Sequence, residues 1–435
     1  MGNSRKSRSP EAVVSSLALF TKGSRVVLGL SGGLDSIVLL HVLKGLESPL
    51  GFSLSCVHVN HKISENAGIW AKFCEDQCRI LDVPIVIEEV DISPHLSSGI
   101  EAAARTARYA VFEKLDADRI VLAHHRDDQA ETVLLQLFRG AGLDGLAAMG
   151  ESVPFGKKTV LRPFLSLSRR EIEAYARERG LEWIEDESNA NPGYDRNFVR
   201  HMLFPVIEAR FPAFRETVSR SARHFAESSR LLEELAEIDG SDAIRDGRLD
   251  VSSLSRLSPS RARNLLRHYL ALEGMRMPSS RRLEEMLRQF ASKGACVAHD
   301  GREIRCYRGF VHVVDAFPVS RDFRNNWEGE SRMDIPELGG ILRFENGENG
   351  LDPGKLFDVN VRGRQGGEHL RTHAHRPTKR LKHLFQEKGI PPWQRDRMPL
   401  LYCGDHLVWV PGLGMDPDYR SDPGKSGLVP SWEPI

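Results

Sequence analysis

The segment Ser31-Gly32-Gly33-Leu34-Asp35-Ser36 has a composition suited to binding an anion. An apolar run at residues 26–30 precedes it and another at 37–43 follows it, a pattern that predicts a strand, a tight turn and a helix. The two glycines allow positive φ and close backbone approach, and the helix start offers N–H groups to phosphate oxygens. The two serines add hydroxyl donors. The segment therefore predicts a phosphate-binding turn.

Asp35 is the unusual residue of this turn. A P-loop would carry lysine before the final Ser or Thr, and a dinucleotide-binding loop would read G-x-G-x-x-G, but the segment has neither pattern. A carboxylate that faces a polyphosphate is tolerable when a cation lies between them, so Asp35 is a candidate Mg²⁺ ligand. The alternative is an ordinary aspartate at a helix start.

A second group of chemically capable side chains lies in "HHRDDQAET", residues 124–132. Asp128 and Glu131 are three residues apart and share one helical face, with His124 one turn earlier. Carboxylates placed there suit an incoming ammonium group and Mg²⁺, for which Glu131 is a second candidate ligand. A helix dipole alone would favour an acid at the helix start, but it would not explain the paired histidines or Glu131.

Arginines and asparagines supply a third group. Arg105 lies on a predicted helix over residues 99–115 and shares a face with Arg108. The stretch "SNANPGYDRNFVR" offers fork-shaped donors for phosphates or a base edge, namely Asn189, Arg196, Asn197 and Arg200. By itself this stretch is equally consistent with a solvated loop.

The C-terminal part contains a local excess of positive charge, although the whole chain of 435 residues has a formal net charge of zero. Residues 362–397 contain ten Arg and Lys against three Asp and Glu. A contact with a nucleic-acid backbone would use such charge without reading sequence, and the candidates are Lys379, Arg380 and Lys382. The alternative is a solvated face.

The elements that must position these groups alternate between strand and helix patterns. Strands are predicted at 26–30, 54–60, 85–90, 119–124 and 158–164, with helices between them. This alternation predicts a doubly wound parallel α/β sheet, whose ligands bind beyond the carboxyl ends of the strands. The phosphate-binding turn, Asn60-His61 and His124-His125 all fall at such ends.

The rest of the chain changes character. Ser168 and Glu171 have the spacing of a helix-capping box. Residues from about 218 onward are mainly helical, with helices at 261–272 and 280–290, before a strand-rich stretch at 303–315. The last part, from about 360, is predicted to have short strands and one helix at 379–388. No run of about 18 apolar residues is present, so no membrane partner is expected.

Ser31–Ser36 resembles the S-G-G-x-D-S loop of the N-type ATP pyrophosphatases, also called PP-loop enzymes. The further stretches "GIEAAARTARYAVF", "HHRDDQAET", "SNANPGYDRNFVR" and "RPTKRLKHLFQEKGIPPWQRDRMPLLY" resemble the tRNA(Ile)-lysidine synthases in matching order and spacing. The resemblance covers nearly the whole chain and is weakest at 215–330. It implies three domains: a PP-loop catalytic domain at 1–214, a mainly helical tRNA-binding or linker domain at 215–330, and a small α+β tRNA-binding domain at 331–435.

The resemblance implies a ligase that uses ATP, L-lysine and the isoleucine tRNA with a CAU anticodon. The wobble cytidine would be adenylated at its C2 oxygen, and lysine would then replace AMP to give lysidine, so that AUA is read instead of AUG. ATP binding falls to residues 31–36, His58 and Asn60, and lysine binding to His124, Asp128 and Glu131. The implied catalytic residues are Asp35, Arg105, Asp128, Glu131 and Arg196.

Two other functions remain open at this point. A related tRNA thiolase would need catalytic or cluster-binding cysteines, but the six cysteines are scattered and form no CxxC pair. A non-catalytic RNA-binding protein that only holds ATP would not require Asp35, Asp128 and Glu131. The sparse cysteines also suit a reducing cytoplasm. The sequence does not fix the oligomeric state, and a homodimer stays open.

Overall fold

The computed structural model describes residues 9–17, 19–187, 193–292 and 294–435. The chain divides into two compact units, Met1–Glu234 and Leu235–Ile435. Each unit has its own hydrophobic core, as expected for a chain of this length.

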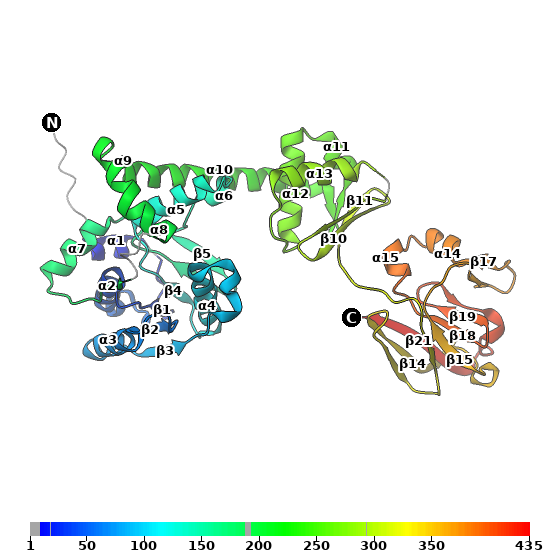
Figure 1. Cartoon of the computed structure of the whole chain (residues 1–435). Coiled ribbons are helices and arrows are strands. Elements are labelled where there is room, and N and C mark those ends of the chain that lie inside the picture. The colour runs from blue at the N-terminus through cyan, green and yellow to red at the C-terminus, as the bar shows by residue number, and fades with distance from the viewer. Residues whose placement is uncertain (1–8, 18, 188–192, 293) are drawn as a thin grey trace. The chain divides into compact units, whose positions relative to one another are not determined.

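A six-stranded sheet forms the centre of the first unit (Figure 1). Its order is β3-β2-β1-β4-β6-β5, and every neighbouring pair is parallel except β5 with β6. The strands are β1 (Arg25–Gly29), β2 (Ser53–Asn60), β3 (Ile85–Glu89), β4 (Arg119–Val121), β5 (Ser152–Phe155) and β6 (Lys158–Leu161). This arrangement confirms the predicted doubly wound parallel sheet.

Helices cover both faces of this sheet. Val26 and Leu28 of β1 point into one core, to which helices α1 (Pro10–Ser16), α2 (Leu34–Leu50), α3 (Ala67–Ile80) and α7 (Arg169–Glu178) contribute. Val27 points into the opposite core, beside α4 (Ile100–Lys114). Because the middle strands are buried on both sides, their sequences read as continuous apolar runs. Because β1, β2 and β4 run parallel, their carboxyl ends meet at one edge of the sheet.

The observed strands differ from the predicted ones at the ends of β4 and β6 and at β5. The strand predicted at 158–164 ends at Leu161. The strand predicted at 119–124 ends at Val121, because the chain then turns to begin α5 (Arg126–Phe138) with His125 as its N-cap. Strand β5 was not predicted: it is a short edge strand that contains Pro154, a residue that edges tolerate. The predicted capping box is present at α7, where the Glu171 N–H donates to Ser168 Oγ (3.3 Å) and the Ser168 N–H donates to Glu171 Oε2 (2.8 Å).

Further helices follow α5 and α7 in the chain. Short α6 (Leu143–Leu146) follows α5 in the chain, and residues 195–210 form one continuous helical segment. That segment consists of α8 (Asp195–Phe198), a π-helical turn (Val199–Leu203) and α9 (Phe204–Arg210). It packs on α5 through a small core that includes Ala130, Val199 and Phe204. Helix α10 (Phe214–Ala243) comes next.

The second unit contains antiparallel sheets. Its first part joins the helices α11 (Val251–Arg256), α12 (Pro259–Leu272) and α13 (Ser280–Phe290) to a sheet of order β7-β8-β11-β10-β9, whose strands are Ile244–Arg245, Arg248–Asp250, Phe310–Asp315, Arg302–Tyr307 and Cys296–His299. The helices and sheet share one core, in which Tyr269 and Met286 are fully buried. The strand-rich stretch predicted at 303–315 thus belongs to this sheet.

The last part of the chain contains three further sheets. The largest has the order β12-β15-β18-β19-β20, formed by Arg324–Asn326, Val359–Arg362, Leu400–Cys403, His406–Val410 and Gly414–Met415. The others are β13-β14-β21 (Arg332–Ile335, Gly340–Glu348, Ser426–Pro434) and β16-β17 (His369–Leu370, Lys379–Arg380). Its helices are α14 (Leu381–Glu387), close to the predicted 379–388, and α15 (Pro392–Arg395). Within the described ranges no helix has both the length and the apolar character needed to cross a bilayer.

Candidate active site

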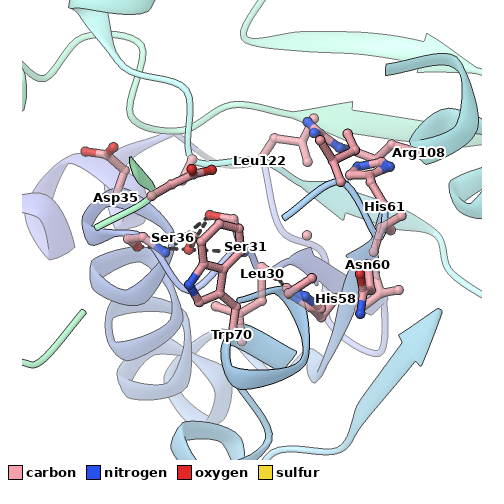
Figure 2. Close-up of a pocket in the computed structure, with 18 of the residues that line it drawn as sticks. Leu30, Ser31, Asp35, Ser36, His58, Asn60, His61, Trp70, Arg108 and Leu122 are labelled. Carbon is pink, nitrogen blue, oxygen red and sulfur yellow. Dashed lines mark hydrogen bonds between the residues drawn. The ribbon is translucent and has the colours of Figure 1, made fainter. Parts of the chain in front are cut away.

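A cavity of about 400 Å³ opens at the carboxyl ends of β1 and β2 (Figure 2). The phosphate-binding turn lines it on one side, and residues that follow β2 line it on the other. Trp70 of α3, Arg108 of α4 and Asp128 of α5 complete the wall. The sheet edge at which the sequence places ligands is therefore the edge that contains this cavity.

The turn between β1 and α2 is shaped by hydrogen bonds of its own. Ser36 Oγ donates to the Gly33 carbonyl (3.0 Å) and accepts from the Ser31 N–H (3.2 Å), which closes the loop. Gly32 has φ +85°, and a Cβ there would come within 3.0 Å of the Ile184 side chain. Gly33 is the N-cap of α2 and, as a glycine, provides no side-chain cap, while its own N–H donates to Ser31 Oγ (3.4 Å). The turn thus offers hydroxyl and backbone donors to an anion.

Asp35 lies in the first turn of α2 and lines the cavity. Its Oδ1 atom is buried and has no hydrogen-bond partner in the described part of the chain, while Oδ2 lies 3.6 Å from His125 Nε2. A buried carboxylate oxygen without a donor is costly unless a ligand satisfies it. No group of three or more His, Cys, Asp or Glu among the described residues is placed to hold a metal ion. A metal bound by Asp35 would therefore take its other ligands from phosphate and water, as Mg²⁺ commonly does.

The end of β2 supplies the predicted ATP-binding residues His58 and Asn60, and both are buried. His58 Nδ1 lies 2.9 Å from the Leu30 carbonyl, a contact that ties β2 to the start of the turn. Asn60 Oδ1 accepts from the Lys62 N–H (2.9 Å). Both side chains therefore shape the cavity wall from inside the fold.

His61 and His124 present imidazole nitrogens to the same cavity. Both ring nitrogens of His61 and Nδ1 of His124 are buried without a hydrogen-bond partner within the described residues. Burial lowers the pKa of His61 to about 4 and that of His124 to about 3. Both rings are therefore neutral at pH 7 and free to bind a ligand. His61 was not among the predicted site residues, although its place next to Asn60 at a strand end was a visible signal.

The start of α5 fixes the position of Asp128. The Asp128 N–H donates to His125 Nδ1 (3.4 Å), and the His125 N–H donates to Asp128 Oδ2 (2.9 Å), which forms a capping box. Burial disfavours the Asp128 carboxylate, but His125 and Arg200 outweigh that effect and lower its pKa. Asp128 therefore lines the cavity as a charged group.

Glu131 lies one helical turn further along α5 and is completely buried. Arg200 donates to both of its oxygens, from Nε to Oε1 (2.6 Å) and from a terminal nitrogen to Oε2 (3.0 Å). Arg196 Nε lies 3.3 Å from Oε2. Burial raises the pKa of Glu131, and the two arginines oppose that rise. The bidentate contact from Arg200 fits the ionised form of the carboxylate.

We call Arg196 and Arg200, together with the Glu131 carboxylate that they contact, the arginine clamp. It changes the roles that these residues can play. Because the Glu131 oxygens are taken up by guanidinium groups, Glu131 presents none to a metal or an ammonium group, so Asp35 and Asp128 are the better candidates. Arg200 also reaches Asp128 Oδ1 (3.3 Å), and Arg196 reaches Glu101 Oε1 (3.2 Å). Both arginines thus face carboxylates here instead of presenting an open surface to RNA.

The two arginines of α4 lie in different environments. Arg108 lines the cavity, and burial lowers its pKa. Arg105 is exposed, its guanidinium carbon lies 4.7 Å from the centre of the Tyr109 ring, and it is not part of the cavity lining. Arg108 is thus the α4 arginine nearest a bound ligand. The i,i+3 spacing could not show which of the two arginines lines the cavity. It shows that they share a face of α4, but not which turn of the helix lies beside the cavity.

The remaining predicted tRNA contacts are spread over both units. Asn189 lies outside the described residues, and Asn197 is buried. In the second unit, Lys379 Nζ lies 2.7 Å from Glu387 Oε1. Arg380 and Lys382 are exposed and have no ion pair within the described chain. These two side chains are therefore the most available of the three predicted C-terminal cations.

Three family models match the chain. Residues 5–207 match the PP-loop domain, residues 249–312 the TilS substrate binding domain, and residues 359–432 the TilS substrate C-terminal domain. A solved U34-tRNA thiolase, NcsA from Methanococcus maripaludis, is 18% identical over 50% of this chain and 78% of its own, with a TM-score of 0.43. That similarity is too low to separate a synthase from a thiolase.

Curated relatives resolve the family. The tRNA(Ile)-lysidine synthase of Nitrosomonas europaea is 43% identical over 423 residues, which cover 95% of this chain and 92% of the relative. The enzyme of the same name from Azoarcus sp. is 38% identical over 98% of this chain and 95% of its own. Identity of this extent spans both units, so the chain belongs to the tRNA(Ile)-lysidine synthase family.

Proposed function

We propose that this chain joins L-lysine to C2 of the wobble cytidine of the isoleucine tRNA with a CAU anticodon, with ATP as co-substrate. Family membership supports the reaction class. At the level of residues, the proposal rests on the cavity. The phosphate-binding turn, Asp35 with its unpaired oxygen, and the charged Asp128 all line it. A thiolase or a purely RNA-binding role gains no support from the named relatives.

The first step would activate the cytosine. The C2 oxygen is a poor leaving group, so it attacks the α-phosphorus of ATP, and the bond to pyrophosphate breaks. The donors of residues 31–36 bind the departing pyrophosphate, where charge accumulates. Asp35 would hold Mg²⁺, which when bound neutralises phosphate charge. Arg108 lies on the cavity wall, where it can bind the phosphate that stays attached to the base.

The second step would form the C–N bond. The lysine Nζ attacks C2, the bond from C2 to the oxygen of AMP breaks, and AMP leaves with that oxygen. The amine attacks only when it is unprotonated, and we assign the proton acceptor to Asp128 because its carboxylate lines the cavity. Glu131 acts through the arginine clamp, which fixes Arg200 beside Asp128. His124 would contact lysine as a neutral ring.

The proposed tRNA contacts are Arg380, Lys382 and Lys379 in the second unit and Asn189 and Asn197 in the first. The three-part division at 214/215 and 330/331, the cytoplasmic location and a homodimer stay predictions. A direct test incubates the protein with ATP, Mg²⁺, labelled lysine and CAU-anticodon isoleucine tRNA, and measures label in RNA. Incorporation that requires ATP is expected, and methionine tRNA with the same anticodon serves as the control. Folded protein that transfers no label would refute the proposal.

A further inference from the structure

The helical segment 195–210 has two faces of opposite character. Its inward face presents Arg196 and Arg200 to the carboxylates of α5. Its outward face is apolar: Phe198 is 51% exposed, Met202 56% and Val206 70%. These three follow one another at intervals of four residues, so they lie along one side of the segment.

Helix α5 extends this exposed surface. Leu137 and Phe138 are 54% and 65% exposed and follow Leu134 by three and four residues, and Leu134 packs against the core shared with the segment. Arg139 lies 3.6 Å from Asp195, which brings the end of α5 beside the start of α8. We call this surface the apolar rim. It consists of Leu137, Phe138, Tyr194, Phe198, Met202 and Val206.

Arginine side chains lie beside the apolar rim. Arg139 is paired with Asp195, and Arg215 is paired with both Glu208 and Asp127. Arg210 is exposed and has no ion pair in the part of the chain that the structure describes. Aromatic side chains at a cationic edge match the platforms that bind unpaired nucleic-acid bases. A contiguous apolar surface of this kind is otherwise unusual on a protein exterior.

We propose that the apolar rim stacks unpaired anticodon-loop bases that neighbour the modified cytidine. This inference rests on the proposed function and deepens it. Arg200 contacts Asp128, which lines the cavity, and a helix is only about 10 Å across. A loop whose cytidine enters the cavity therefore passes the outward face of the segment within a few nucleotides. Clamp and rim, on opposite sides of one segment, then fix the cytidine and its neighbours together.

Fluorescence of an anticodon stem-loop RNA tests this inference on the full-length protein. The adenine of CAU is replaced by 2-aminopurine, whose emission falls when it stacks. Wild-type protein is expected to quench it, whereas Phe198→Ala combined with Phe138→Ala should remove most of the quenching. The double variant should also bind the stem-loop about 10-fold more weakly, equivalent to about 1.4 kcal/mol, with an unchanged salt slope. Phe198→Trp with Phe138 intact should retain quenching.

Ile80→Ala is the matched control, since Ile80 is 71% exposed on α3 and lies outside the rim. It should behave as wild type. If the double variant binds and quenches as wild type does, the inference is overturned. If it binds RNA normally but changes from dimer to monomer in sedimentation, the rim is a self-association surface and the inference is again overturned. Failure of the proposed function would appear differently, as absence of lysine incorporation by the wild-type protein.

Discussion

Replacing Arg200 with methionine tests whether the clamp balances a buried charge. Glu131 is 0% exposed, and Arg200 provides two of its contacts, at 2.6 and 3.0 Å. Removing one partner of a buried ion pair commonly costs about 3–5 kcal/mol because the other charge stays buried. Arg196 remains 3.3 Å away, so we expect the lower end, about 3 kcal/mol. Arg200→Met combined with Glu131→Met removes both charges and should cost about 1 kcal/mol or less.

Calorimetry of the full-length protein measures these differences. The chain has two units, so the transition that ATP shifts upward is assigned to the first unit. In a unit of this size, about 3 kcal/mol corresponds to a fall of roughly 6–12 °C in Tm. Hydrogen exchange over residues 126–138 should accelerate in the single variant. Arg177→Met is the control, because Arg177 is 69% exposed and, among the residues that the structure describes, its ion pair is with Glu173 across one helical turn, which is worth about 0.3–0.5 kcal/mol.

Two outcomes would refute this reasoning. A single variant that is no less stable than the Arg177→Met control would mean that Glu131 is not an uncompensated charge once Arg200 is removed. A double variant as unstable as the single one would mean that packing, and not charge, holds the segment on α5.

Three further outcomes are expected. Asp35→Asn should reduce pyrophosphate release at least about 100-fold while tRNA affinity stays within about 2-fold, and an equal loss of both would indicate misfolding instead. Changing Lys379, Arg380 and Lys382 to Ala should make the dependence of log K on log salt shallower by about 2, because Lys379 is already paired with Glu387; an unchanged slope would remove this site from the interface. His61 has a folded pKa of about 4 against an ordinary 6.5, so the unfolded state binds more protons between these values and stability falls as pH drops from 6.5 to 4. His61→Phe should flatten that fall in urea titrations, and a parallel fall would show that His61 is not buried as a neutral ring.

The parallel sheet could be predicted from the sequence because burial on both faces leaves a strong local pattern. Val26, Val27 and Leu28 are all buried, as expected for an interior strand of a sheet that is covered on both faces. The phosphate-binding turn was equally local, since its glycines and serines act within six residues. Strand β5 left little pattern, because it is an edge strand with only partial burial.

The clamp could not be predicted, because its members are distant in sequence. Arg196 and Arg200 contact Glu131 from 65 and 69 residues away. An arginine fork fits a phosphate and a carboxylate equally well, so the sequence alone could not choose between RNA and the protein's own acids. The same limit applies to Arg105 and Arg108, whose different environments depend on where α4 lies against the sheet.

The π-helical turn at Val199–Leu203 has a consequence for how the chain can vary in length. A π-turn accommodates one more residue than an α-helical turn. Deleting one residue there can therefore convert the π-turn into a regular α-helical turn and leave Phe204 in its core. A deletion elsewhere in the segment 195–210 would instead rotate everything beyond it by about 100°. Aligned relatives should either keep the count between Arg196 and Phe204 or lack one residue there.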